Sequence, residues 1–204
     1  MQKLNLLNYH LILIILSAWL LSACSKPDER IYLTQSSVVV AFGDSLTRGK
    51  GTSEENSYPS VLKNLLGVEV INEGISGEVS SKGLARLENV LQKHTPDLVV
   101  LCHGGNDILK KLPLADLERN LEAMISLIQS KGAKVILVGV PKPSLSLSSL
   151  DLYENLADKH NLVSDLDILS DLLEQRSMKS DKVHLNAQGY RALATAISKK
   201  IEVL

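Results

Sequence analysis

Apolar and polar positions follow one another along this chain in two different rhythms. Short runs rich in valine, isoleucine and leucine predict strands that are covered on both faces, as in a parallel sheet. Longer stretches, in which apolar residues recur every three or four positions, predict amphipathic helices between those strands. The predicted strands lie near residues 37–42, 68–72, 97–103, 134–140 and 162–165.

Capping and helix-breaking residues mark the limits of the predicted helices. Ser57 suits an N-cap, and a later helix should stop before Pro96, because the residue before a proline disfavours helical dihedrals. Another helix begins near Pro113 and ends at Gly132, which suits the left-handed position after a helix. The last helix follows Asn186. Its predicted buried stripe comprises Tyr190, Leu193, Ala194, Ile197 and Ile201.

This order of elements predicts one α/β domain over residues 37–204. Alternating strands and helices build three α/β/α layers around a central parallel sheet of about five strands, in a flavodoxin-like arrangement. The 204 residues suffice for one such domain with a substantial core. A formal charge of −1 gives no indication of a nucleic-acid partner, and we expect a monomer.

Residues 1–24 are predicted to be a targeting segment outside the domain. Lys3 supplies a small positive region, and the apolar run 11–21 is shorter than the roughly 20 residues of a spanning helix. The letters L-S-A-C that end at Cys24 resemble the lipobox of bacterial lipoproteins, which implies lipidation of that cysteine; an uncleaved signal anchor is the alternative. We expect an exported protein, lipid-anchored to the cell membrane or outer membrane and facing the periplasm or exterior, with residues 25–36 as a polar tether.

The other cysteine, Cys102, lies inside the apolar run 98–102. With Cys24 lipidated, it has no partner for an intrachain disulfide. We expect Cys102 to be a small buried hydrophobic residue.

Candidate catalytic groups lie where predicted strands end or predicted helices begin. Ser45 directly follows the first strand of the sheet, where ligand and catalytic groups gather in parallel sheets; Gly-Asp-Ser is also ordinary turn chemistry. His184 precedes the last helix and could act as a base, since imidazole titrates near neutral pH. Asp181, three residues earlier, could orient that ring, although a solvated loop would explain the same spacing.

Four short blocks occur in order: GDSL at 43–46, GISG at 74–77, GGND at 104–107 and DKVH at 181–184. Together they resemble the GDSL esterase/lipase family, also called SGNH hydrolases. The run 72–87, with I-S-G-E and G-L-A-R-L, is similar to the bacterial thioesterase/lysophospholipase/arylesterase branch of that family. The resemblance extends from about residue 38 to the end of the chain.

The resemblance implies roles for individual residues. Ser45, His184 and Asp181 would be nucleophile, base and orienting acid. The backbone N–H groups of Ser45 and Gly77 and the side-chain amide of Asn106 would bind the oxyanion, for which Gly77 permits close approach and Asn106 supplies uncharged donors. No cofactor is expected.

The remaining polar residues near these blocks are given other roles. Asp44 and Asp107 are expected to hold loop structure. His103 could line the cleft or pack beneath it; no motif typical of a metal site supports the alternative that it binds a metal with Asp107, Asp181 and His184. His94 and His160 follow lysines at predicted helix C-termini, where positive charge is favourable, and are expected to be structural.

The expected function is hydrolysis of carboxylic esters or thioesters, with a small-molecule ester or a lysophospholipid as substrate. The loop 141–150 carries several leucines, which could form an apolar wall for an acyl chain or belong to the start of the next helix. Three alternatives stay open: a carbohydrate O-acetyl esterase, a catalytically silent binding lipoprotein of the same fold, and a phosphodiesterase or metal-dependent hydrolase.

Overall fold

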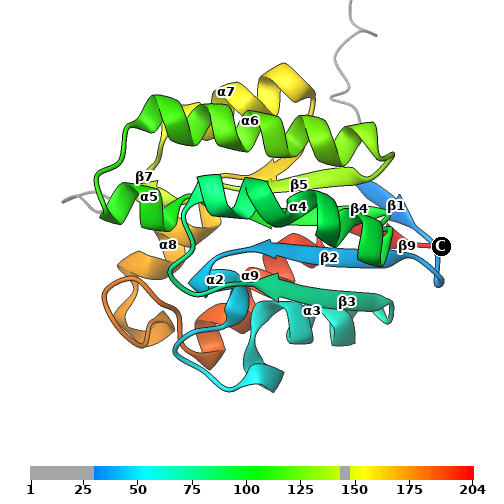
Figure 1. Ribbon diagram of the computed structural model, residues 1–204. Helices are drawn as coiled ribbons and strands as arrows, with labels where there is room; N and C mark the ends of the chain where they lie inside the picture. The colour runs from blue at the N-terminus through cyan, green and yellow to red at the C-terminus, as the bar shows by residue number, and fades with distance from the viewer. Residues whose placement is uncertain (1–29, 143–147) are drawn as a thin grey trace, which may run out of the picture.

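A central parallel sheet organises the computed structural model, which describes residues 30–142 and 148–204 (Figure 1). Within these residues, five strands form the sheet in the order β3-β2-β4-β5-β8. Their bounds are β2 Val38–Gly43, β3 Glu69–Gly74, β4 Leu98–Cys102, β5 Lys134–Val138 and β8 Val163–Asp165. Counted along the chain, the order is second, first, third, fourth, fifth, which is the flavodoxin-like order. The predicted strands and fold class are confirmed.

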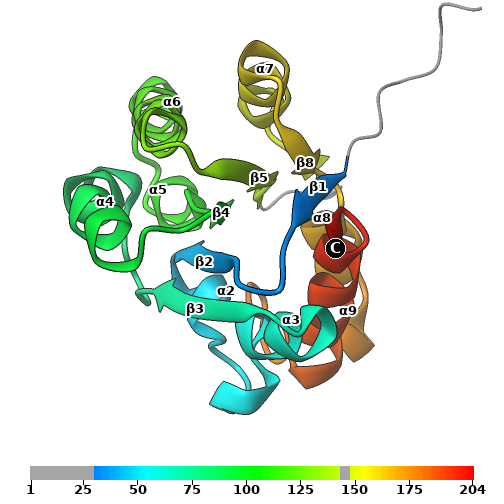
Figure 2. The same cartoon turned by 90° about the vertical axis from the view of Figure 1, so that its right-hand side faces the viewer.

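Helices cover both faces of this sheet (Figure 2). One face carries α4 (Ser80–His94), α6 (Leu114–Ser130) and α7 (Asp151–His160). The other carries α3 (Tyr58–Leu66), α8 (Ile168–Glu174) and α9 (Ala187–Ser198). Shorter elements follow strand ends and loops: α2 Ser45–Arg48, η1 Glu54–Asn56, α5 Gly105–Leu109, β6 Pro141–Lys142, β7 Ser148–Ser149 and η2 Arg176–Met178.

The core fills the two spaces between the sheet and its helices. Val39, Val40, Ala41 and Phe42 of β2 have no exposed surface. Strand β4 is equally buried, and Cys102 at its end is covered as predicted. A strand with helices on both faces has no solvated side, which explains why both strands read as continuous apolar runs.

The helix limits follow the predicted signals. Ser57 precedes α3, and α4 ends at His94, ahead of Pro96. Gly132 adopts φ +84° shortly after α6. Asn186 caps α9 by accepting a hydrogen bond from the Gly189 N–H at 3.0 Å.

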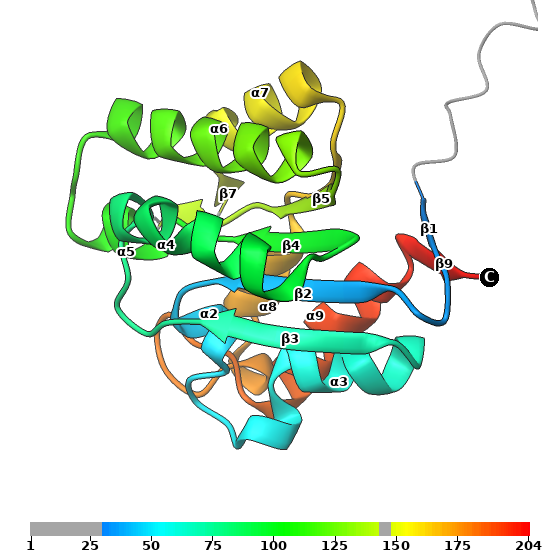
Figure 3. The ribbon, with the colours of Figure 1, turned by 45° about the vertical axis from the view of Figure 1, so that its right-hand side comes forward.

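Two predictions at the chain ends are wrong. Strand β1 (Ile31–Leu33) pairs in parallel with β9 (Ile201–Val203), so residues 31–33 belong to the domain and not to a tether (Figure 3). Ile31 and Leu33 are buried, because this small second sheet closes one side of the core. Ile201 is also buried, but it lies in β9 and not on the last helix.

The predicted targeting segment 1–24, with Cys24, lies outside the described residues. No helix in the described part of the chain is both long and apolar enough to cross a membrane.

Candidate active site

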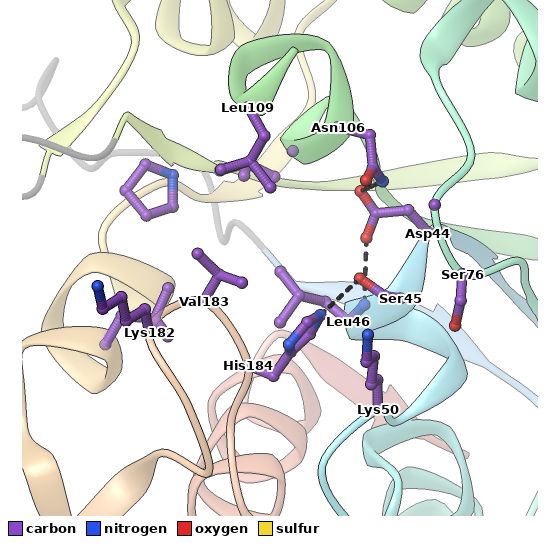
Figure 4. Close-up of a pocket in the computed structure, with 15 residues that line it drawn as sticks. Asp44, Ser45, Leu46, Lys50, Ser76, Asn106, Leu109, Lys182, Val183 and His184 are labelled. Atoms are coloured by element: carbon purple, nitrogen blue, oxygen red, sulfur yellow. Dashed lines mark hydrogen bonds between the residues drawn. The ribbon is translucent and has the colours of Figure 1, made fainter.

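A pocket of about 280 Å³ opens at the carboxyl edge of the sheet (Figure 4). Ser45 lies at the end of β2, Gly77 in the loop after β3, and Asn106 in the short helix after β4. His184 comes from the loop before α9, far along the chain. The four signature blocks therefore meet in one cavity, because parallel strands carry their following loops to the same edge.

Ser45 is presented by a tight turn between β2 and α2. Asp44 caps α2: its carboxylate accepts a hydrogen bond from the Leu46 N–H at 3.1 Å. A side chain at Gly43 would place its Cβ 2.0 Å from the Cys102 carbonyl oxygen, and one at Gly74 would lie 2.2 Å from the Arg48 nitrogen. Both glycines are therefore required for the close approach of β3 and β4 to the turn that carries the serine.

A continuous chain of hydrogen bonds joins a hydroxyl, an imidazole and a carboxylate. Ser45 Oγ lies 3.0 Å from His184 Nε2, and His184 Nδ1 lies 2.8 Å from Asp181 Oδ2. An ionised carboxylate can only accept, so Nδ1 carries the hydrogen and Nε2 is left to accept from Ser45. The three residues predicted for this role are thus adjacent in the order the chemistry needs.

Asp181 also shapes the loop that carries the imidazole. Its Oδ1 accepts hydrogen bonds from the N–H groups of Val183 and His184, both at 2.9 Å. Desolvation raises the pKa of the Asp181 carboxyl, but these two bonds and the one from the His184 ring outweigh it and hold the pKa below its ordinary value of 3.8. The carboxylate is consequently charged at neutral pH.

The predicted oxyanion donors line the same pocket. Gly77 adopts φ +82°, a conformation that favours glycine. Asn106 Nδ2 donates to the carbonyl oxygen of Glu78 at 2.9 Å and to the carboxylate of Asp44 at 3.2 Å. Burial raises the pKa of Asp44, which lines the pocket but has little exposed surface.

Asp107 acts as a structural link, as predicted. Its carboxylate accepts hydrogen bonds from the N–H and the hydroxyl of Ser80, at 2.8 and 2.7 Å. These bonds attach α5 to the first turn of α4. The helix that carries Asn106 is therefore fixed to the helix that follows Gly77.

His103 lies beneath the pocket and does not line it. It has no exposed surface, and its Nδ1 accepts a hydrogen bond from the Gly104 N–H at 2.9 Å. Its Nε2 consequently carries the hydrogen and faces the Glu78 carboxylate at 3.3 Å. His94 contacts Glu73 at 2.8 Å. Among residues 30–142 and 148–204, no group of three histidine, cysteine, aspartate or glutamate side chains is placed to hold a metal ion.

One side of the pocket is apolar, and most of it was missed by sequence reasoning. Its apolar lining residues are Leu46, Leu109, Val140, Pro141, Leu173 and Val183. Of the predicted acyl-binding loop 141–150, Pro141 lines the pocket, while residues 143–147 lie outside the described part of the chain. Leu150 packs on the core as the N-cap of α7, which bears out the alternative interpretation for that residue. In the sequence, only its position three residues after Asn106 indicated that Leu109 lies near the site.

A three-layer α/β domain with a serine, an imidazole and a carboxylate joined at the carboxyl edge of its sheet is typical of serine hydrolases. The model of the GDSL-like Lipase/Acylhydrolase family matches residues 41–192, and the chain belongs to this family.

Similar proteins agree with that assignment. An arylesterase of Vibrio mimicus is 38% identical over 148 residues, which cover 68% of this chain and 70% of the relative. Thioesterase 1/protease 1/lysophospholipase L1 of Escherichia coli (strain K12) is 26% identical over 178 residues, covering 81% and 84%. The crystal structure of TesA matches with a TM-score of 0.73 at 26% identity, covering 80% of this chain and 97% of that one. The predicted family is confirmed.

Proposed function

We propose that this protein is a serine esterase that hydrolyses carboxylic esters or thioesters through Ser45, His184 and Asp181. The observation that carries the proposal is the hydrogen-bond chain from Ser45 Oγ through His184 to Asp181, at 3.0 and 2.8 Å, open to a partly apolar pocket. The names of the similar arylesterase and thioesterase support the same reaction class.

The proposed reaction has two halves. His184 Nε2 takes the proton of Ser45 as Oγ attacks the ester carbonyl. It then passes that proton to the leaving alcohol or thiol. An acyl group is left on Ser45. Water, deprotonated by the same nitrogen, attacks the acyl-enzyme, and the proton passes to Ser45 as the acid leaves. Asp181 stabilises the imidazolium in both halves and keeps the ring in the required tautomer.

We propose the N–H groups of Ser45 and Gly77 and the Asn106 amide as the oxyanion donors. The longer of the two bonds made by Asn106 Nδ2, the 3.2 Å contact with Asp44, is the one to be exchanged for the substrate oxygen. The bond to the Glu78 carbonyl would keep the amide in place. Losing one such donor typically lowers the rate by about 10²–10³-fold.

The apolar wall of the pocket, formed by its apolar lining residues, favours a substrate with an apolar acyl chain over one with a polar group. Leu46 and Leu109, of two short helices, and Leu173, of α8, all line the cavity. Burial of each methylene against such a surface contributes about 0.8 kcal/mol. We therefore propose esters or thioesters with an extended acyl chain, lysophospholipids among them, as substrates.

We also propose that Cys24 is lipidated and that the protein is exported and held at the cell membrane or outer membrane. The lipobox-like L-S-A-C ending at Cys24 supports this location. Mass spectrometry of the membrane fraction tests it: a diacylglyceryl mass on an N-terminal cysteine is expected, and an unmodified intact N-terminus would contradict it.

The function is tested with nitrophenyl esters from acetyl to palmitoyl, with Ser45→Ala in parallel. We expect the rate to peak at medium or long chains and to vanish in the variant, which should unfold at the wild-type temperature. Serine-dependent activity confined to acetyl esters would favour a deacetylase. Rates that are equal in the two proteins would remove Ser45 from the mechanism, and no activity on any ester would favour a binding protein.

A further inference from the structure

Arg86 of α4 occupies the space under the carboxyl ends of two neighbouring strands. Its Nη2 donates to the Glu73 carbonyl oxygen of β3 at 2.8 Å and lies 3.4 Å from the Gly43 carbonyl oxygen of β2. Its guanidinium lies 4.1 Å from the centre of the buried Phe42 ring, close enough for cation–π attraction. Arg86 therefore ties together the ends of the strands that lead to Ser45 and to Gly77.

The same guanidinium holds the Glu78 carboxylate by three hydrogen bonds, of which two are short. Arg86 Nε lies 2.8 Å from one carboxylate oxygen and Nη2 lies 2.7 Å from the other. The buried ring of His103 contacts that carboxylate at 3.3 Å from below. Desolvation raises the pKa of Glu78, but the bonds from His103 and Arg86 outweigh it and lower the pKa below its ordinary value of 4.5.

Glu78 is connected to the two proposed oxyanion donors that do not belong to Ser45. It follows Gly77 directly, and its own carbonyl oxygen accepts the hydrogen bond from Asn106 Nδ2 at 2.9 Å. Gly77, by contrast, would meet no heavy atom within 4 Å even with a Cβ added. The loop is anchored next to Gly77 by the Glu78 side chain, which is only 7% exposed and is bound by an arginine that is 19% exposed, and by the hydrogen bond from the Glu78 N–H to the Ile75 carbonyl oxygen at 3.2 Å.

We propose that Arg86 and Glu78 are positioning residues, which hold the Gly77 N–H and the Asn106 amide where an oxyanion forms. This inference rests on the proposed function. Neither side chain lines the pocket, so they act through the donors and do not touch the substrate. A bidentate guanidinium–carboxylate pair suits this task because two parallel bonds fix both position and orientation.

Arg86→Met tests the proposal, since methionine keeps an aliphatic stem but none of the donors. We expect kcat for a nitrophenyl ester to fall about 10–100-fold, somewhat less than the loss of a whole donor. KM should change little, because ground-state binding by the apolar wall is untouched. Lys131→Met is the matched control. It removes a cation that pairs at 3.4 Å with Glu88, which lies on α4 like Arg86, and it should leave kcat unchanged because this pair is away from the pocket.

A double-mutant cycle with Asn106→Ala separates positioning from general stability. If Arg86 acts through the donors, Arg86→Met should cost several-fold less in the Asn106→Ala background than in the wild type, because one of the two donors that it positions is already gone. Equal losses in the two backgrounds would overturn the inference while leaving the esterase proposal intact. Absence of ester hydrolysis in the wild type would overturn both.

Glu78→Gln gives an independent variant should Arg86→Met not fold. It keeps the backbone carbonyl that binds Asn106 but replaces one carboxylate oxygen by an amide nitrogen, which cannot accept a hydrogen bond from the guanidinium. We expect the same fall in kcat, again reduced in the Asn106→Ala background. Wild-type kcat in Glu78→Gln would contradict the inference.

Discussion

At the scale of single residues, Asp181 has two functions that are carried by different oxygen atoms. Oδ2 faces the His184 ring, whereas Oδ1 accepts the two backbone N–H groups that shape the loop. A substitution could remove one function and spare the other. The pair of oxygens therefore allows orientation of the imidazole to be separated from formation of the loop.

Asp181→Asn should lower kcat by about 10²–10⁴-fold, because an amide can favour the wrong imidazole tautomer and cannot stabilise the imidazolium. The depressed pKa of the native carboxyl also implies a pH-dependent effect on stability. An acid whose pKa is lower in the folded state stabilises the fold above its unfolded value, and this contribution is lost as the pH falls through the folded value.

Urea unfolding of the wild type and Asp181→Asn at several pH values tests that dependence. We expect the wild type to be more stable near neutral pH and the difference to shrink below the ordinary pKa of 3.8. A difference in unfolding free energy that grows on acidification would contradict the sign of the shift.

Leu109 offers a second test at this scale, because it lines the pocket and is still 50% exposed. Leu109→Ala should lower kcat/KM for medium-chain esters by about 5–10-fold, the equivalent of roughly 1–1.5 kcal/mol of lost apolar contact, and change it little for acetyl esters. Leu65→Ala is the matched control, since Leu65 is 49% exposed on α3 and outside the pocket. Equal effects on acetyl and longer esters would remove Leu109 from the acyl site.

At the scale of elements, β1 and β9 form a clamp between the two ends of the domain. Leu33 is 3% exposed, although it lies in a strand of only three residues. The clamp has no part in the pocket. It should therefore affect stability and not catalysis.

Leu33→Ala should lower the free energy of unfolding by about 2–5 kcal/mol, as for other buried leucines. Gln35→Ala, in the exposed turn that follows, is the control and should change it by less than about 0.5 kcal/mol. Denaturant unfolding measures both variants, and kcat on nitrophenyl esters should be preserved in each. An unfolding free energy of Leu33→Ala within error of the wild type would mean that β1 is not part of the stable fold.

The clamp also shows why some elements could not be predicted. Val38 to Phe42 forms a run long enough to identify β2, whereas Ile31 and Leu33 alternate with a single polar-tipped Tyr32 in a stretch of charged and polar residues. Their burial depends on a partner near the other end of the chain, and no local pattern reveals that partner. Short helices such as α5 and α8 were missed for the same reason, and with them the apolar wall contributed by Leu109 and Leu173.

The site was more accessible to prediction than its surroundings. Ser45, His184 and Asp181 could be named because each lies in a block with unusual local chemistry at a strand end or a helix start. The roles of Arg86 and His103 could not be assigned, since their partners are backbone groups and two glutamate carboxylates, most of them distant in the sequence. Sequence patterns therefore identify the proposed catalytic side chains more readily than the side chains that keep them in position.

At the scale of the whole molecule, the short helices that contribute to the pocket and the pair β1–β9 lie at opposite edges of the sheet (Figure 1). Helices α2 and α5 border the pocket edge, whereas β1 and β9 lie near the strand starts. An attachment before residue 31 would therefore join the domain at the edge away from the pocket. Access of substrate to the pocket would then come from the side that faces away from the attachment.

The parallel pairing of β1 with β9 brings the start and the end of the described domain side by side. Leu204 donates its N–H to the Leu33 carbonyl at 2.9 Å, and the Arg30 side chain meets Glu202 at 2.7 Å, so the first and last described residues of the domain are neighbours. In a chain that starts at residue 30, a linker of a few residues could join this residue to Leu204 and close the domain into a circle without moving either strand. The chain could then be opened in an exposed loop instead, and a circular permutant would keep the pocket because none of its lining residues lies near the new junction.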